Sequence, residues 1–154
     1  MSVRADAETF RSIPIFSECD AVHLQLLAFS AQRQQFGIGD ALLKQGLRGR
    51  SAYLILSGRA DVLSGEEKVG SAGPGAMLGE VAMIGDLPYA VTARATEPLT
   101  AARIDRDLFM RLAAEYPEFG TAVFGALARK LEGSMAGLGD VQRMFEQART
   151  FRRL

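Results

Sequence analysis

Hydrophobic residues recur at helical spacing near both ends of this chain but not in its middle. Residues 7–30 predict helices, and Asp20 is placed to cap the start of one of them. Leu24, Leu27 and Ala28 follow at positions that share one face of a helix. We therefore expect an N-terminal helical segment over residues 1–31.

Between residues 32 and 104, short apolar runs alternate with turn signals that are rich in glycine. The run AYLIL at 52–56 is followed by Ser57-Gly58 and then by RADVL at 59–63. Two such runs around a glycine predict a β-hairpin that turns at Gly58. Many short strands at near-regular spacing predict an all-β sandwich, roll or barrel over 32–104.

After Ile104 the apolar period lengthens again to that of a helix. Asp105 is expected to cap a helix that carries Leu108 and Phe109, and Pro117 suits the first turn of another. An apolar stripe at steps of three or four then runs through Phe119, Val123, Leu127, Leu131, Met135, Leu138, Val141 and Phe145. Three glycines between 133 and 139 interrupt the stripe and predict a kink or a close helix–helix approach there.

The whole pattern predicts an α+β fold. We expect an antiparallel β-roll, jelly-roll-like or of the double-stranded β-helix kind, over residues 32–104. Helices over 1–31 and 105–154 flank it in the chain, and all three parts belong to one domain. A chain of 154 residues, 48% of them hydrophobic and 23% charged, is long enough to bury one such core.

Composition narrows the classes of chemistry. Basic and acidic residues are equal at 18 each, so the basic excess of a DNA-binding surface is missing. Cys19 and His23 are the only residues of their types, which argues against metal sites, disulfides and Ser–His or Cys–His catalysis. We expect neither an enzyme nor a metalloprotein. No apolar run is long enough to span a membrane and no secretion signal is apparent, which favours the cytoplasm.

The stretch from Gly75 to Ala93 carries the most chemical information. Gly79-Glu80-Val81-Ala82 places backbone N–H groups around the start of a short helical turn, and such a turn attracts anions. The Glu80 carboxylate is suited to accept hydrogen bonds from sugar hydroxyls. The stretch therefore predicts a site for a small polar ligand.

This stretch resembles the phosphate-binding cassette of the cyclic-nucleotide-binding domain family, whose members include catabolite-activator-type regulators and kinase regulatory subunits. The resemblance rests on Leu78-Gly79-Glu80-Val81-Ala82-Met83 and on turn glycines from 39 to 75, and it covers about residues 13–145. It implies a β-roll sensor whose ligand-binding residues are Leu78, Gly79, Glu80, Val81, Ala82, Tyr89, Ala90 and Val91. It also implies that Ser134 belongs to a helical lid over the ligand.

One position departs from the family pattern. Tyr89-Ala90 stands where the family has arginine followed by Ser, Thr or Ala. An arginine there pairs with the cyclic phosphate through a planar fork, whereas tyrosine offers one neutral O–H donor. The implied ligand, cAMP or cGMP, is therefore in question. Arg94 lies an odd number of strand positions away and is expected on the opposite face, while Lys44, Arg48 and Arg50 precede AYLIL and are candidate substitutes.

Two functions of different classes fit these features. The first is a stand-alone regulatory sensor that binds a small anionic or nucleotide-like ligand and signals through its C-terminal helices. The second is a degenerate cyclic-nucleotide-binding fold that acts without ligand as a dimerisation or docking module, with Tyr89 filling the pocket. In both, the C-terminal stripe predicts a homodimer.

Activator-type DNA binding is not expected, because no recognition helix follows the C-terminal helix. A metal-dependent cupin enzyme is excluded by the single histidine.

Overall fold

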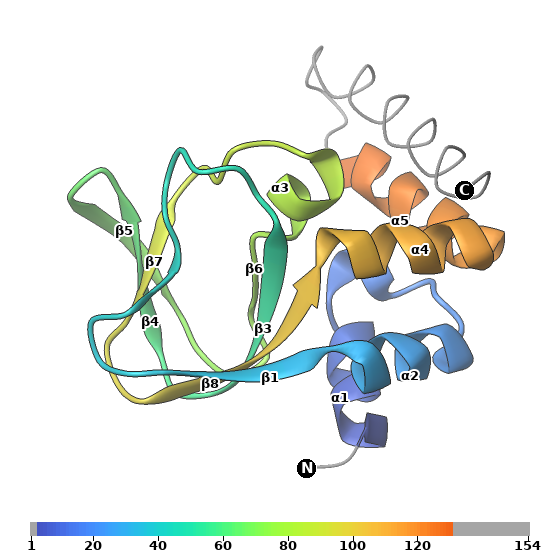
Figure 1. Cartoon of the computed structure of the whole chain (residues 1–154), viewed down its shortest axis with the longest axis horizontal. Helices are drawn as coiled ribbons and strands as arrows, with labels where there is room; N and C mark the ends of the chain where they lie inside the picture. The colour runs from blue at the N-terminus through green and yellow to red at the C-terminus, as the bar shows by residue number, and fades with distance from the viewer. Residues whose placement is uncertain (1–2, 131–154) are drawn as a thin grey trace. The chain divides into compact units, whose positions relative to one another are not determined.

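The computed structural model describes residues 3–130. The chain divides into two compact units, of which one is Ala31–Arg106 and the other joins Met1–Ser30 to Asp107–Leu154. The fold is α+β, with helices before and after two antiparallel sheets (Figure 1).

The Ala31–Arg106 unit is the β-roll. Its two four-stranded sheets have the orders β1-β8-β3-β6 and β2-β7-β4-β5. The elements are β1 (Gln32–Phe36), β2 (Ala41–Leu43), β3 (Ser51–Ser57), β4 (Ala60–Ser64), β5 (Glu67–Ala72), β6 (Met77–Leu78), α3 (Glu80–Gly85), β7 (Thr92–Ala95) and β8 (Leu99–Asp105). β1 pairs with β8, and β2 pairs with β7. The first half of this unit therefore runs antiparallel to its second half, as in a β-roll.

The hairpin predicted around Gly58 is wrong. The runs on either side of it form β3 and β4, which lie in different sheets and do not pair with each other. Gly58 turns the chain from one sheet to the other with a φ of 89°, and a Cβ there would lie 2.4 Å from the Pro98 carbonyl oxygen. A glycine between two apolar runs marks a sharp turn, but its local pattern does not distinguish a hairpin from a corner between sheets.

The core of the roll is formed by inward-facing side chains of both sheets. Phe36 of β1 packs edge-to-face against Tyr53 of β3, with ring centroids 5.7 Å apart. Leu43, Ala60 and Ala93 meet them from the second sheet, and all are buried. Alternation along β7, in which Ala93 and Ala95 are buried while Arg94 is exposed, is the period of two that places one face of a strand in the core.

The second unit is helical. It contains α1 (Val3–Arg11), a 3-10 turn at Pro14–Phe16, α2 (Ala21–Ser30), most of α4 (Arg106–Glu115) and α5 (Pro117–Lys130). Its core is a cluster of phenylalanine rings in which Phe16 stacks on Phe119, and Phe109 contacts both Phe119 and Phe124. Aromatic rings at these separations bury large areas and fix the helices in register.

Several helix predictions are confirmed. Helix α2 begins directly after Asp20 and buries Leu24, Leu27 and Ala28, and α5 begins at Pro117. Phe119, Val123 and Leu127 of the predicted stripe are buried. The stripe residues from Leu131 onward, and Ser134, lie outside the described residues. No helix within residues 3–130 is long and apolar enough to cross a membrane.

Candidate ligand-binding site

The site is built around the turn that starts α3. Gly79 has a left-handed φ of 79° and stands at the N-cap of α3, where its carbonyl oxygen accepts a 2.9 Å bond from the Met83 N–H. A Cβ on Gly79 would lie 2.9 Å from the Tyr89 ring and 3.1 Å from Leu43. Glycine is therefore required here by the backbone conformation and also by the close approach of the Tyr89 ring.

The other end of α3 is held by Arg106, a buried residue that follows β8 directly and is the first residue of α4. Its Nη1 donates to the carbonyl oxygens of Met83, at 2.5 Å, and Ile84, at 2.6 Å. A guanidinium at a helix C-terminus satisfies carbonyls that have no partner within the helix and interacts favourably with the helix dipole. Arg106 was not among the predicted site residues, because nothing in the local sequence pattern distinguishes it from an ordinary surface arginine at a helix start.

The loop before β3 pairs with the segment after α3. Gly49 donates to the Leu87 carbonyl oxygen at 2.8 Å, and Tyr89 donates its backbone N–H to the Leu47 carbonyl oxygen at 2.8 Å. Arg48 Nε lies 2.9 Å from a carboxylate oxygen of Asp86, the C-cap of α3. Of the three cations considered as substitutes for the missing arginine, Arg48 is thus paired outside the cavity.

A cavity of about 270 Å³ lies against this turn. Its lining residues are Leu43, Gly79, Glu80, Val81, Ala82, Leu87, Pro88, Tyr89, Ala90 and Val91. Seven of the eight residues predicted to bind ligand are in this set, and the eighth, Leu78, lies in β6 opposite Tyr53. Among the lining residues within the described range 3–130, Glu80 alone is charged, and neither Lys44 nor Arg50 belongs to the lining. Arg94 is exposed, and its Nη1 donates to the Gly39 carbonyl oxygen at 2.9 Å.

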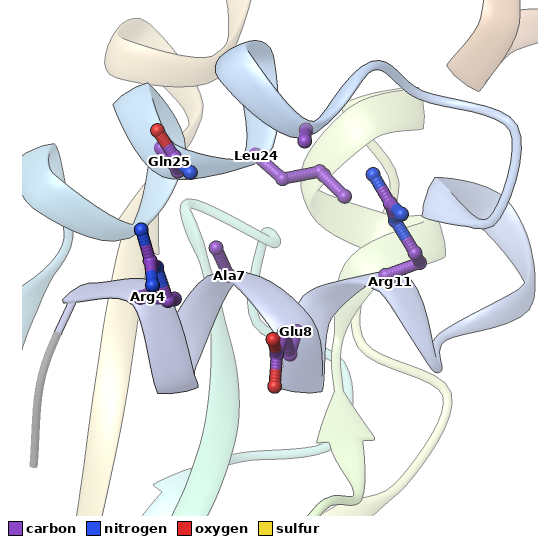
Figure 2. Close-up of a pocket in the computed structure, with 7 residues that line it drawn as sticks. Arg4, Ala7, Glu8, Arg11, Leu24 and Gln25 are labelled. Carbon is purple, nitrogen blue, oxygen red and sulfur yellow. The ribbon is translucent and has the colours of Figure 1, made fainter.

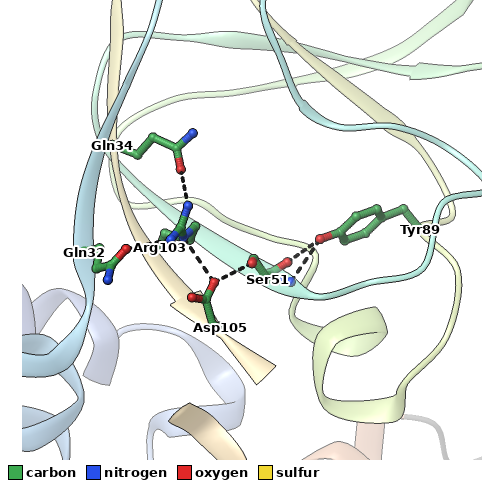
Figure 3. A network of polar contacts seen from close by, with 6 residues as sticks. All are labelled: Gln32, Gln34, Ser51, Tyr89, Arg103 and Asp105. Carbon is green, nitrogen blue, oxygen red and sulfur yellow. Dashed lines mark hydrogen bonds and ion pairs between the residues drawn. The ribbon is translucent and has the colours of Figure 1, made fainter. Parts of the chain in front are cut away.

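The Tyr89 hydroxyl is bonded to the protein itself. It donates to the Ser51 carbonyl oxygen at 2.6 Å and accepts from the Ser51 N–H at 3.2 Å, and only 9% of Tyr89 is exposed (Figure 3). Burial raises the pKa of Tyr89 above its ordinary value, which keeps the phenol neutral. The cavity wall at this position is therefore an uncharged ring whose polar atom points to β3.

Ser51 also continues the polar contacts from Tyr89 to β8 (Figure 3). Its Oγ donates to Asp105 at 2.6 Å, and Asp105 lies 3.1 Å from Arg103 Nε. Arg103 in turn donates to Gln34 at 3.0 Å and Gln32 at 2.6 Å. One chain of contacts thus joins the cassette tyrosine to strands β3, β8 and β1. A substitution at Tyr89 therefore removes contacts of the first residue of β3.

Comparison with known proteins identifies the class. A sequence profile of the cyclic nucleotide-binding domain family matches residues 33–116, more than half of the chain. The chain belongs to this family. The cAMP-dependent protein kinase regulatory subunit of Hypocrea atroviridis is 33% identical over 100 residues, which are 65% of this chain and 22% of that protein. The corresponding subunit of Mycosarcoma maydis is 29% identical over 124 residues, or 78% of this chain and 22% of that subunit.

Two solved structures are similar in fold. The N-terminal domain of a transcriptional regulator from Streptomyces coelicolor A3(2) superposes with a TM-score of 0.74 at 22% identity, covering 83% of this chain and 95% of that one. A cyclic nucleotide-binding-like protein from Brucella abortus has a TM-score of 0.64 at 30% identity, covering 70% and 97%. This chain spans about a fifth of the kinase regulatory subunits it matches, so it corresponds to one part of them. Both kinase-related proteins named above are regulatory subunits, which agrees with a regulatory role for this family of domains.

Proposed function

We propose that this chain is a regulatory sensor domain that binds a small nucleotide-like ligand in the cassette cavity and signals through its C-terminal helices. The observation that carries the proposal is the cavity itself, which the Gly79–Ala82 turn and the Tyr89–Val91 segment line together. Its volume of about 270 Å³ is close to the lower end of the range for small-molecule sites.

The lining defines how such a ligand is held. Most of its side chains are apolar. The one charged group among its described residues is the Glu80 carboxylate, which repels a phosphate and is of a type that accepts hydrogen bonds from hydroxyls. Loss of a buried charged hydrogen bond costs about 2–5 kcal/mol, or about 30-fold to several-thousand-fold in affinity. We therefore infer that recognition rests on the sugar and base of a nucleotide-like molecule, and that cAMP and cGMP bind weakly.

A second function is favoured by the bonds of Tyr89. Its ring packs against Gly79 and its hydroxyl is bonded to the N–H and the carbonyl oxygen of Ser51, so the tyrosine fixes the cassette turn to β3 without a ligand. In that case the domain is a ligand-free docking or dimerisation module. The homodimer through the C-terminal helices and the cytoplasmic location both stay predictions, and sedimentation equilibrium of the purified protein tests the first.

Isothermal titration with cAMP, cGMP and adenosine, on the wild type and on Tyr89→Arg, separates these functions. The sensor predicts measurable binding of at least one compound by the wild type, and cyclic-nucleotide binding at least 30-fold tighter in Tyr89→Arg, with adenosine unchanged. Arg94→Ala is the matched control, because Arg94 is exposed and outside the cavity. Absence of binding by the wild type to all three, with a folded Tyr89→Arg that does bind cAMP, would favour the ligand-free module.

Signalling has its own test. If the ligand acts on the C-terminal helices, amide hydrogen exchange of α4 and α5 changes when the ligand binds, because a ligand shifts only those segments whose stability differs between the two states. Binding that protects α3 and β7 while leaving α4 and α5 unchanged would contradict the signalling part of the proposal alone.

A further inference from the structure

Helix α2 carries an apolar stripe on the side opposite its buried face. Val22 is 57% exposed and Phe29 is 77% exposed. The two residues are seven positions apart, which is about two helical turns, so they share one face of the helix. The half-buried Leu26 lies between them on the same side. We call Val22, Leu26 and Phe29 the outer stripe of α2.

The other sides of α2 have partners within the helical unit. Leu24 and Gln25 line a cavity of about 230 Å³ between α2 and α1, and Figure 2 shows the Leu24 side chain directed toward α1. The His23 ring lies against the Tyr116 ring, with centroids 5.2 Å apart. The outer stripe takes part in neither contact, so its side of α2 is the one left open within residues 3–130.

The chemistry of the outer stripe restricts what can cover it. The ten residues of α2, AVHLQLLAFS, include no charged side chain. A helix that is apolar on both its inner and its outer side is typical of one that is covered on both, and neighbouring exposed apolar groups mark interaction surfaces. Because α2 offers no charge for an ion pair, an occupant gains its contact free energy from an apolar face of its own.

The chain beyond the described residues begins beside the start of α2. Helix α5 ends at Lys130, and Arg129 in its last turn forms an ion pair with Glu18, three residues before α2 begins. Both partners belong to the helical unit. Phe29 lies eleven residues after Glu18, or about 16 Å along a helix, whereas residues 131–145 span about 22 Å as a helix and more when extended. That segment is therefore long enough to reach the whole outer stripe.

The sequence of this segment suits the surface. Its apolar residues recur at helical spacing and continue the stripe whose first members are buried in α5, and they are Leu131, Met135, Leu138, Val141 and Phe145. A short tether holds such a segment at an effective concentration of about millimolar near its attachment point. At lower protein concentrations, contact within one chain is therefore favoured over contact with a second copy.

We propose that residues 131–145 dock on the outer stripe of α2 in the same chain, with their apolar positions covering Val22 and Phe29. Gly133 gives the chain the conformational freedom to change direction after α5. One apolar face covers one surface at a time, so a segment docked on α2 is withheld from a ligand lid and from a dimer interface. The outer stripe is thus a resting place for the segment to which the sequence assigns those two roles.

Photocrosslinking from position 29 of the full chain tests this contact. Phe29 is replaced by p-benzoylphenylalanine, which keeps an aromatic ring and reacts with C–H bonds that touch it, and the crosslinked peptides are identified by mass spectrometry. We expect crosslinks to residues 131–145 of the same chain, with equal yield at about 1 µM and about 100 µM protein, both below the effective concentration of the tether. The matched control carries the same residue at Ile38, which is 70% exposed in the β-roll unit, and is expected to give no such crosslink.

Amide hydrogen exchange of Val22→Ser/Phe29→Ser supplies a second readout. Both side chains are exposed, so the fold is expected to persist, as unchanged exchange of α3 and β7 would verify. Exchange within residues 131–145 is expected to become about tenfold faster, because docking protects these amides only while the contact lasts. Ile38→Ser is expected to leave their exchange unchanged.

The outcomes separate the possible occupants. Crosslinks that join two chains, recognised by mixing isotope-labelled and unlabelled protein, would mean that a second copy covers the outer stripe and would overturn the proposal. It is also overturned if position 29 crosslinks only elsewhere or not at all. Equal exchange of residues 131–145 in the wild type and in Val22→Ser/Phe29→Ser counts against it in the same way.

Discussion

Removing one oxygen atom from Tyr89 tests how the cassette is held together. In Tyr89→Phe the ring stays in place against Gly79, while the bonds to the Ser51 carbonyl oxygen and N–H are lost. The substitution adds no atom, so it introduces no steric clash at Gly79. What remains is the buried backbone of Ser51 at the start of β3, whose N–H and carbonyl oxygen both lose the tyrosine as a partner.

The magnitude follows from burial. Ser51 and Tyr89 are each 9% exposed, so water does not readily replace the hydroxyl. A typical hydrogen bond contributes about 0.5–1.5 kcal/mol, and a polar group stranded in the interior costs about 1–3 kcal/mol. The bond to the carbonyl oxygen is short, at 2.6 Å, and the one from the N–H is longer, at 3.2 Å. We expect Tyr89→Phe to lower the free energy of unfolding by about 2 kcal/mol.

Urea denaturation measures this loss. With an m value of about 2 kcal/mol/M, the midpoint of the transition moves down by about 1 M and the slope stays constant. Tyr116→Phe is the matched control, because the Tyr116 ring packs against His23 and its hydroxyl has no hydrogen-bond partner among residues 3–130. A change below about 0.5 kcal/mol for Tyr89→Phe, equal to that of the control, would refute the claim that Tyr89 is bonded to Ser51.

Three further predictions concern stability and reactivity. Arg106→Ala strands the Met83 and Ile84 carbonyl groups, and we expect a loss of about 3 kcal/mol by urea denaturation, against less than 1 kcal/mol for the exposed Arg94→Ala. A Cβ on Gly49 would lie 2.6 Å from Ala82, so Gly49→Ala is expected to cost about 1–3 kcal/mol, while Gly70→Ala meets no atom within 4 Å and is tolerated. Burial, assisted by the charges of Asp20 and Glu18, raises the pKa of the Cys19 thiol from 9.0 to about 11. At pH 8 we therefore expect the thiolate fraction of Cys19, and with it the rate of its alkylation, to be about 100-fold lower in the folded protein than in urea. The pKa of Cys19 is higher in the folded than in the unfolded protein, so the stability that the neutral thiol contributes is complete below pH 9 and is lost as the pH rises toward 11. Cys19→Ala is therefore expected to flatten the plot of unfolding free energy against pH between these two values.

The fold was predictable because its signals are local and repeat often. Periods of two and of about 3.6 identified strands and helices, and Pro117 marked the start of α5. The corner at Gly58 was mistaken for a hairpin, because the identity of a strand's neighbour depends on distant residues. β3 pairs with β8, some fifty residues later in the chain, and no local pattern records that pairing.

The site was predictable only in its outline. The resemblance located the Gly79–Ala82 turn, but the sequence did not reveal that Arg106 holds the other end of α3 or that Gly49 packs against Ala82. It also left the role of Tyr89 open, because whether a tyrosine faces a ligand or the backbone depends on where Ser51 lies. Such contacts join residues 22 to 38 positions apart and arise from the closure of the roll.

Any ligand that occupies the position of the Tyr89 hydroxyl must first break its hydrogen bonds to Ser51. Displacing the hydroxyl costs the same free energy that Tyr89→Phe removes, about 2 kcal/mol, so the affinity of such a ligand falls about 30-fold. The missing arginine weakens a cyclic phosphate independently, through the loss of a charged fork. The two effects separate experimentally, because Tyr89→Phe removes the first and leaves the second. A ligand that Tyr89→Phe binds about 30-fold more tightly than the wild type competes with Tyr89 for Ser51, whereas one with unchanged affinity occupies the cavity beside an undisturbed tyrosine.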